Sequence, residues 1–109
     1  MEDELYKFMA HKVTNEYSQK MVDVSVQQFD MDSNMVNETT KRAGELYKEF
    51  TSPRKVASAL KQECDKKYGR AWNCITGRDF TSYVSYQKGM FLEFMIGDYN
   101  FILFKSGDK

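Results

Sequence analysis

The stretch from Lys67 to Tyr86 constrains the fold more than any other part of the sequence. It predicts the end of a helix, a turn at Gly69 in the positive-φ position that closes helices, and then two short strands joined at residues 77–79. In the second strand, Phe80 to Tyr86, bulky side chains alternate with small polar ones. Such a strand can bury one face and still offer its backbone to a partner. We therefore expect this strand to be the part of the protein that carries its function.

Apolar spacing and capping residues predict the other elements. A stripe of apolar residues at i, i+4, i+8 and i+12 predicts a helix over residues 3–20. Alternation predicts a strand over 24–29, and good capping residues precede helices over 33–50 and from Pro53 to about Tyr68. After residue 71 we expect only strands and turns, with a two-residue turn at Gly97-Asp98 between strands 90–96 and 99–104. The last of these is nearly all apolar, so it should lie centrally in a sheet.

Composition excludes several classes of protein. The chain has 109 residues, enough for one domain, and its 16 basic residues balance 16 acidic ones. This neutrality argues against bulk electrostatic binding of nucleic acid or of an anionic membrane. No apolar run approaches the ~20 residues that span a bilayer, so we expect no membrane insertion. The acidic start, Met1 to Glu4, is unlike a secretory signal, and two cysteines without metal-like spacing suit a reducing compartment such as the cytoplasm.

Residues with catalytic or metal-binding chemistry are few. His11 is the single histidine and lies among polar neighbours, which favours a solvated surface position. Cys74 shares a strand face with Trp72, which favours a buried small hydrophobe over a nucleophile. Residues 30–34 resemble the start of a calcium loop, but Met35 stands where such a loop needs glycine. We therefore predict a protein that is not an enzyme and that has no cofactor and no metal site.

Over three quarters of the chain, from about Val24 to Gly107, resembles the small dynein light chains. The resemblance implies an α+β fold, in which two helices pack on an antiparallel sheet, for a dynein-light-chain-like domain over residues 23–109. Residues 1–22 are expected to form an N-terminal helical extension or linker. The resemblance also implies a two-fold homodimer. The matching residues are Asp30-Met31, Met35, Asp65-Lys66-Lys67-Tyr68, Trp72, Cys74-Ile75, Gly77-Arg78, Phe80, Ser82-Tyr83-Val84, Phe91, Phe94, Gly97 and Ile102-Leu103-Phe104-Lys105-Ser106-Gly107.

In this family the strand like Phe80 to Tyr86 crosses to pair with the partner subunit's sheet, and its free edge lines a groove. Extended peptides of other proteins, dynein intermediate chain among them, enter the groove and add a strand. By this resemblance the groove residues are Arg54, Asp79, Phe80, Thr81, Ser82, Tyr83, Val84, Ser85, Tyr86, Phe91 and Glu93. The residues expected at the dimer interface are Lys61, Trp72, Asn73, Ile75, Ser82, Tyr83 and Ser85.

The sequence departs from the family pattern at the expected groove. Pro53 stands where the family has a glutamate that receives a polar peptide side chain, commonly glutamine. Thr81 stands where the family has a glycine that lets the peptide backbone approach closely. We expect the fold and the dimer to survive and the peptide preference to change. Asn73 and Tyr86 replace two histidines, and Glu93 and Met95 replace two tyrosines.

A helical segment before a light-chain-like domain also resembles the C-terminal half of flatworm tegumental-allergen-like proteins. Those proteins join a calcium-binding EF-hand pair to such a domain. The alternative function is therefore a scaffold domain of a tegumental calcium-binding protein whose groove no longer binds motif peptides. On that reading residues 3–20 are a connecting helix, the calcium sites lie outside this chain, and the protein is associated with the cytoskeleton or the tegument.

Overall fold

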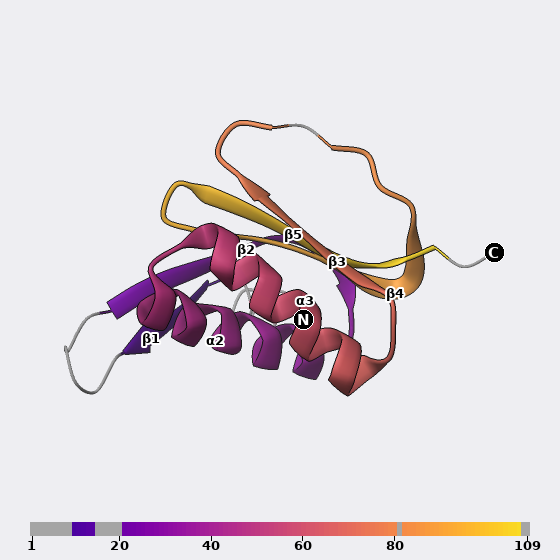
Figure 1. The fold of residues 1–109 in the computed structure, drawn as a ribbon, viewed down its shortest axis with the longest axis horizontal. Coiled ribbons are helices and arrows are strands. Elements are labelled where there is room, and N and C mark those ends of the chain that lie inside the picture. Colours follow the sequence, from indigo (N-terminus) through magenta and orange to yellow (C-terminus); the bar gives the residue numbers. More distant parts are fainter. Residues whose placement is uncertain (1–9, 15–20, 81, 108–109) are drawn as a thin grey trace.

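The computed structural model describes residues 10–14, 21–80 and 82–107. In this part of the chain a five-stranded sheet, antiparallel throughout, has the strand order β1-β2-β4-β5-β3. Helices α2 and α3 lie side by side across one face of it (Figure 1). The elements are β1 (Ala10–Thr14), β2 (Met21–Met31), α2 (Ser33–Phe50), α3 (Pro53–Tyr68), β3 (Trp72–Gly77), β4 (Tyr86–Ile96) and β5 (Tyr99–Ser106).

The hairpin of β4 and β5 forms the middle of the sheet. Gly97 opens its turn at φ 60°, a value that glycine adopts without steric penalty. The pairing of Ile96 with Tyr99 and of Leu92 with Leu103 sets the register. β5 lies between β4 and β3, which confirms the central position predicted for this apolar strand.

Capping side chains set the helix boundaries. The Asp32 carboxylate accepts hydrogen bonds from the backbone N–H groups of Asn34 and Met35, and the Ser52 hydroxyl accepts one from Lys55. Pro53 follows in the first turn of α3, where its missing N–H leaves no bond unmade. Gly69 ends α3 at φ 85°. The structure confirms the spans predicted for α2 and α3. Both could be predicted because capping depends on residues close in the sequence and needs no distant partner.

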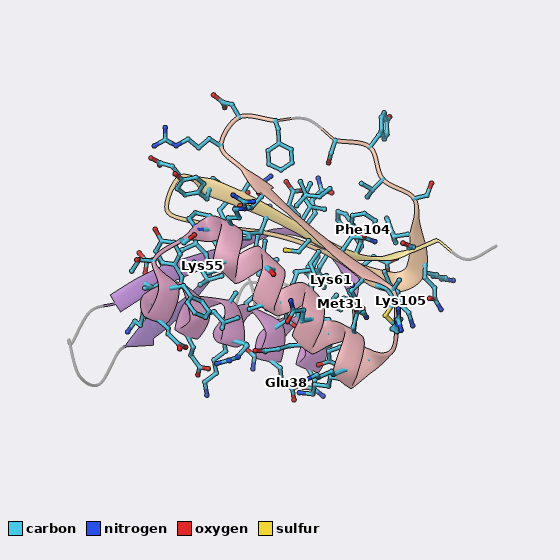
Figure 2. All side chains as sticks on the ribbon, in the orientation of Figure 1. Met31, Glu38, Lys55, Lys61, Phe104 and Lys105 are labelled. Atoms are coloured by element: carbon cyan, nitrogen blue, oxygen red, sulfur yellow. The ribbon has the colours of Figure 1, made fainter. Side chains whose placement is uncertain are left out.

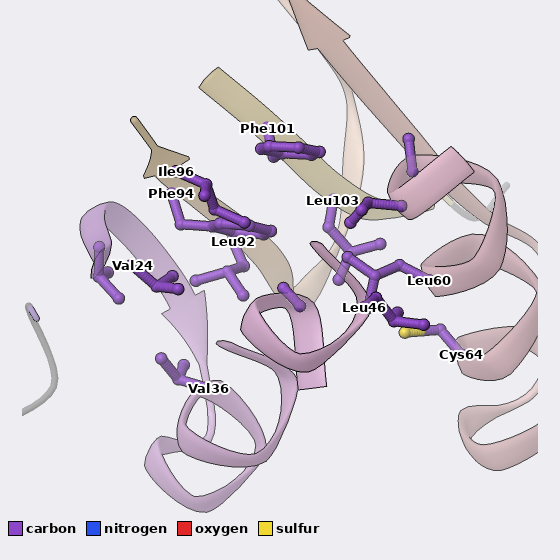
Figure 3. Close-up of a cluster of buried hydrophobic side chains, with 14 of the residues drawn as sticks. Val24, Val36, Leu46, Leu60, Cys64, Leu92, Phe94, Ile96, Phe101 and Leu103 are labelled. Carbon is purple, nitrogen blue, oxygen red and sulfur yellow. The ribbon is translucent and has the colours of Figure 1, made fainter. Parts of the chain in front are cut away.

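The core lies between the sheet and the two helices (Figure 3). Strand alternation turns Leu92, Phe94 and Ile96 toward the helices. The rings of Phe94 and Phe101 stack there with centroids 5.0 Å apart. The helices complete this layer with a strip of buried aliphatic side chains, among them Val36, Leu46, Val56 and Leu60.

A carboxylate joins the end of α3 to the start of β3. Asp65 Oδ1 accepts a hydrogen bond from the backbone N–H of Trp72 at 2.8 Å, and Asp65 also forms an ion pair with Lys61. The bond from Lys61, followed by that from Trp72, lowers the pKa of Asp65 below its ordinary value of 3.8. The Trp72 side chain is fully buried beneath α3, so β3 is held to the core at its first residue.

The helix predicted for residues 3–20 is wrong over the part that the structure describes. Ala10–Thr14 is strand β1, which pairs antiparallel with residues 21–25 of β2, and His11 lies opposite Val24. The remainder of the predicted helix lies outside the described residues. The outer edge of β2 offers a row of backbone donors and acceptors, and this tertiary pairing overrides a helical spacing of apolar residues.

The strand predicted for Phe80 to Tyr86 is also corrected, because Tyr86 is the only described residue of this segment that belongs to a strand. The β3–β4 connection, here residues 78–80 and 82–85, has no strand pairing within the chain. It arcs over the face of the sheet that the helices leave open (Figure 1). Alternating side chains favour an extended backbone, but a strand also needs a hydrogen-bonding edge beside it, and the described part of the chain supplies none there.

Truncation of a central ring should test the core. We expect Phe101→Ala to lower the free energy of unfolding by about 3–5 kcal/mol, because it leaves a cavity beside Phe94 in a fully buried layer. Phe50→Ala is the control, since Phe50 is 37% exposed at the end of α2 and should cost much less. Urea denaturation at one fixed protein concentration measures both. Equal losses for the two variants would contradict this description of the core.

The Asp65 carboxylate should make stability depend on pH. A carboxyl group whose pKa is lower in the folded state stabilises that state above its unfolded pKa, and this contribution is lost as the pH falls through the lower folded value. Asp65→Asn should therefore be less stable than the parent at pH 7, and the gap should narrow as the pH falls below about 3.8. Urea midpoints measured from pH 7 to pH 2.5 test this; a gap that stays constant would contradict it.

Candidate functional site

A hollow lies between the β3–β4 connection and the open face of the sheet. Its floor comes from β2, β4 and β5, and its far wall comes from the connection and from the first residue of β4. Phe104, on β5, points toward this side of the sheet in Figure 2. The residues that line the hollow are Gln28, Phe80, Ser82, Tyr83, Val84, Tyr86, Phe91, Glu93, Asn100 and Ile102.

The floor of the hollow carries a polar cluster. Glu93 of β4 lies between Gln28 of β2 and Ile102 of β5, its direct cross-strand neighbours. Asn100 Nδ2 donates a hydrogen bond to Glu93 Oε2 at 2.8 Å. This bond assigns the amide nitrogen to Glu93, and Asn100 Oδ1 is then buried and accepts no hydrogen bond from a described residue. The floor therefore contains a buried acceptor that lacks a donor among the described residues.

The wall is aromatic and apolar. Tyr86 stacks on Phe91 with ring centroids 4.7 Å apart and an interplanar angle of 26°. The ring of Phe80 lies against Gly77, since a Cβ placed on that glycine would come within 3.3 Å of Phe80 Cδ1. The hollow thus combines apolar surface with a few fixed polar groups, as sites for extended or small ligands commonly do.

Beside the hollow lie one unpaired strand edge and one unpaired segment. β3 pairs with β5 on one side only and is the last strand in the order β1-β2-β4-β5-β3, so its outer edge faces no described strand. The β3–β4 connection makes no strand pairing either. Large apolar groups are exposed on both: Ile75 of β3 is 38% exposed, and Tyr83 of the connection is fully exposed.

Comparison with known proteins places this geometry in a family. Residues 23–106 match the family model described as "Dynein light chain type 1". The chain belongs to the dynein light chain family. It is 40% identical over 86 residues to "Dynein light chain 1, cytoplasmic" of Candida glabrata, an alignment that covers 79% of this chain and all of that protein. Members of the dynein light chain family are non-enzymatic adaptors, and membership supports a protein-interaction adaptor role for this chain.

Solved structures agree on the fold. The dynein light chain-like domain of the Fasciola hepatica calcium binding protein FhCaBP2 superposes with a TM-score of 0.68 at 19% identity, covering 78% of this chain and 93% of that one. The DLC-like domain of CsTAL3 superposes with a TM-score of 0.61 at 12% identity, covering 78% and 94%. At these identities the likeness concerns the fold alone, and it confirms the predicted α+β class.

The hollow gathers most of the groove residues expected of a dynein light chain. Seven of the eleven line it: Phe80, Ser82, Tyr83, Val84, Tyr86, Phe91 and Glu93. Arg54 lies apart, exposed in the first turn of α3. Asp79 and Ser85 are exposed on the β3–β4 connection and do not line the hollow. Thr81 lies outside the described residues.

The residues expected at the light-chain dimer interface divide into three groups. Ile75, Ser82, Tyr83 and Ser85 lie on the two unpaired segments and are exposed. Asn73 is on β3, where its amide donates to Ser106 Oγ at 2.9 Å, and Lys61 is on α3 in its ion pair with Asp65. Trp72 is 0% exposed, so its side chain belongs to the core of its own chain and only its backbone lies at the edge strand.

Sequence reasoning missed Gln28, Asn100 and Ile102, which lie on the floor of the hollow. Ile102 was predicted only as an apolar residue of a central strand, with no role in the groove. Asn100 carried a usable signal, because it is the single polar side chain between Tyr99 and Phe104. Its partner Glu93 lies on another strand, however, and the register that joins them is visible only in the folded sheet.

The remaining reactive groups have structural roles or are shielded. Burial raises the pKa of both thiols, Cys64 and Cys74, to about 12. Asp32 caps α2, and Asp30 Oδ2 accepts a hydrogen bond from the N–H of Gly89 at 3.1 Å. In the described part of the chain, no group of three or more His, Cys, Asp or Glu side chains is placed to hold a metal ion. Neither described helix is long and apolar enough to cross a membrane.

Proposed function

We propose that this light chain is a homodimer in which residues 80–86 of each subunit pair with the outer edge of β3 of the other. The dimer then binds extended peptides of other proteins by strand addition at the free edge of the exchanged segment. One observation carries the proposal: the chain has both an unpaired strand edge and an unpaired segment with strand-like alternation. Each is the partner that the other lacks.

Backbone hydrogen bonding supports the exchange. An exposed edge strand is a template for pairing, and soluble proteins usually cover or interrupt such edges. The outer edge of β3 extends over the 6 residues from Trp72 to Gly77. The exchanged segment is of similar length, so one subunit's segment can cover the other's edge, and the same exchange buries Ile75 and Tyr83, whose apolar surfaces are now exposed.

Peptide addition follows from the geometry of a strand. Successive residues direct their N–H and C=O groups to opposite edges. If one edge of the exchanged segment pairs with β3, the other is open beside the hollow, where Phe91, Tyr86 and Val84 form an apolar wall. Backbone bonds then supply affinity, and the hollow receives alternate side chains of the peptide.

Two single proline variants at adjacent positions test separately the edge that pairs with β3 and the edge that binds the peptide. Sedimentation equilibrium of the parent should give twice the 12.8-kDa chain mass. Ser82→Pro and Tyr83→Pro each remove one N–H, and because neighbouring N–H groups face opposite edges, one variant should shift toward monomer while the other stays dimeric and loses peptide binding. A parent that is monomeric at micromolar concentration would contradict the proposal, and so would two variants that behave as the parent does.

The peptide preference should differ from that of other dynein light chains. Pro53 lacks the acceptor that receives a glutamine amide, and an amide buried without a partner costs about 1–3 kcal/mol. Thr81 brings a branched side chain to a position where the family has glycine. We expect a glutamine-centred family peptide to bind weakly, and the double variant Pro53→Glu with Thr81→Gly to recover more affinity than either change alone.

Calorimetry with that peptide measures the recovery. Ser58→Glu is the control, because it adds the same charge on an exposed position of α3 without restoring the acceptor at residue 53. Low-micromolar binding by the unaltered protein would show that neither substitution acts as proposed. If no extended peptide binds the dimer, the alternative role as a scaffold domain of a tegumental calcium-binding protein is favoured.

The same proposal covers the biological setting. The partners are extended segments of other proteins, with dynein intermediate chain among the candidates, and the setting is cytoplasmic and associated with the cytoskeleton. Support comes from the family and from the relative of Candida glabrata, whose name places it in the cytoplasm.

A further inference from the structure

We infer that the hollow selects peptides that place an arginine or lysine side chain over Glu93. The inference rests on the proposed function, since it names the class of peptide that the groove takes. The first observation is that Glu93 is the only charged side chain among the described residues that line the hollow, and the others are polar or apolar.

The free acceptors of the floor make this charge available. Glu93 uses Oε2 to accept from Asn100, and Oε1 has no hydrogen bond from a described residue. Asn100 Oδ1 is buried without a donor. Gln28, directly across from Glu93 on β2, makes no hydrogen bond to it. A buried acceptor without a donor is destabilising, so an occupant that brings N–H groups is favoured over one that brings only acceptors or apolar atoms.

The arginine of the β3–β4 connection contacts another group. Arg78 precedes Phe80 by two residues, but its guanidinium lies over the ring of Tyr99, 5.4 Å from the centroid. Among the described residues no lysine or arginine forms an ion pair with Glu93, so this carboxylate is available to a cation of a bound peptide. A guanidinium presents N–H donors in a planar fork that suits a carboxylate such as Glu93, while an ammonium can donate to Glu93 Oε1 as a point charge.

The floor keeps this character in the dimer. Glu93 and Asn100 belong to adjacent central strands of the sheet, so their pair remains whichever subunit supplies the wall. The aromatic pair Tyr86 and Phe91 lies along the same hollow and can cover the aliphatic stem of a long basic side chain. Excluding water in this way strengthens a charge-assisted hydrogen bond.

Selection from a random-peptide library on the immobilised full-length dimer tests the inference. We expect the parent to enrich peptides with a basic residue at one fixed position, and Glu93→Gln to lose that enrichment. Glu49→Gln is the matched control, since it removes the same charge from an exposed position on α2 and should enrich as the parent does. Circular dichroism and sedimentation of each variant verify that the fold and the dimer are unchanged.

Calorimetry with one selected peptide then measures how much the charge of its basic residue contributes to the affinity. Replacing its arginine by citrulline keeps the shape and removes the charge, and we expect about tenfold weaker binding to the parent and little change for Glu93→Gln. Equal affinity of the two peptides for the parent, or no enriched basic position, would overturn this inference and leave the proposed function standing. Failure of the dimer to select any peptide would overturn both.

Discussion

The rest of the structure depends on the antiparallel pairing of β4 with β5. This register places every second residue on the same face, so that Leu92, Phe94 and Leu103 meet the helices while Glu93 and Ile102 face the other way. One set of backbone hydrogen bonds therefore builds both the core and the floor of the hollow. A slip of one residue would bury Glu93 beneath the helices and expose Phe94, which explains why the register is strongly specified.

The open edge of β3 is the structural basis of the proposed dimer. The strand is anchored at Trp72, whose side chain lies in the core and whose N–H bonds to Asp65, so the edge is rigidly presented. The β3–β4 connection is long enough to leave the sheet and returns as β4 at Tyr86. A fold with a rigid edge and an unpaired, alternating segment is suited to assembly with a second copy and then with a peptide, in keeping with an adaptor role.

Substitutions in this light chain change the chemistry of the floor and leave its architecture intact. Where the resemblance implies tyrosines, Glu93 and Met95 occupy alternate positions of β4, and the Glu93 carboxylate is held by Asn100. Affinity from backbone pairing does not depend on these side chains, whereas selectivity does, because an unpaired acceptor discriminates against any occupant without a donor. Under the proposed function, these substitutions would direct the same scaffold to a different set of peptides.

The sequence by itself determined the elements whose signals are local. Asp32, Ser52 and Pro53 delimit the two helices through bonds within a few residues, and Gly97 marks the hairpin. Alternation identifies β2, whose Val24 and Val26 are buried. A resemblance spread over three quarters of the chain then led to the family and to most of the residues that line the hollow, from Phe80 to Glu93.

Only the tertiary structure decided what depends on a partner distant in the sequence. Ala10–Thr14 is a strand because the edge of β2 lies beside it, and residues 82–85 are not one because no described strand edge lies beside them. Trp72 belongs to the core because α3 packs over it, and Asn100 joins the floor because the register brings it to Glu93. Backbone hydrogen bonds between strands and the burial of side chains are long-range interactions, and no local pattern of residues specifies which segments will meet.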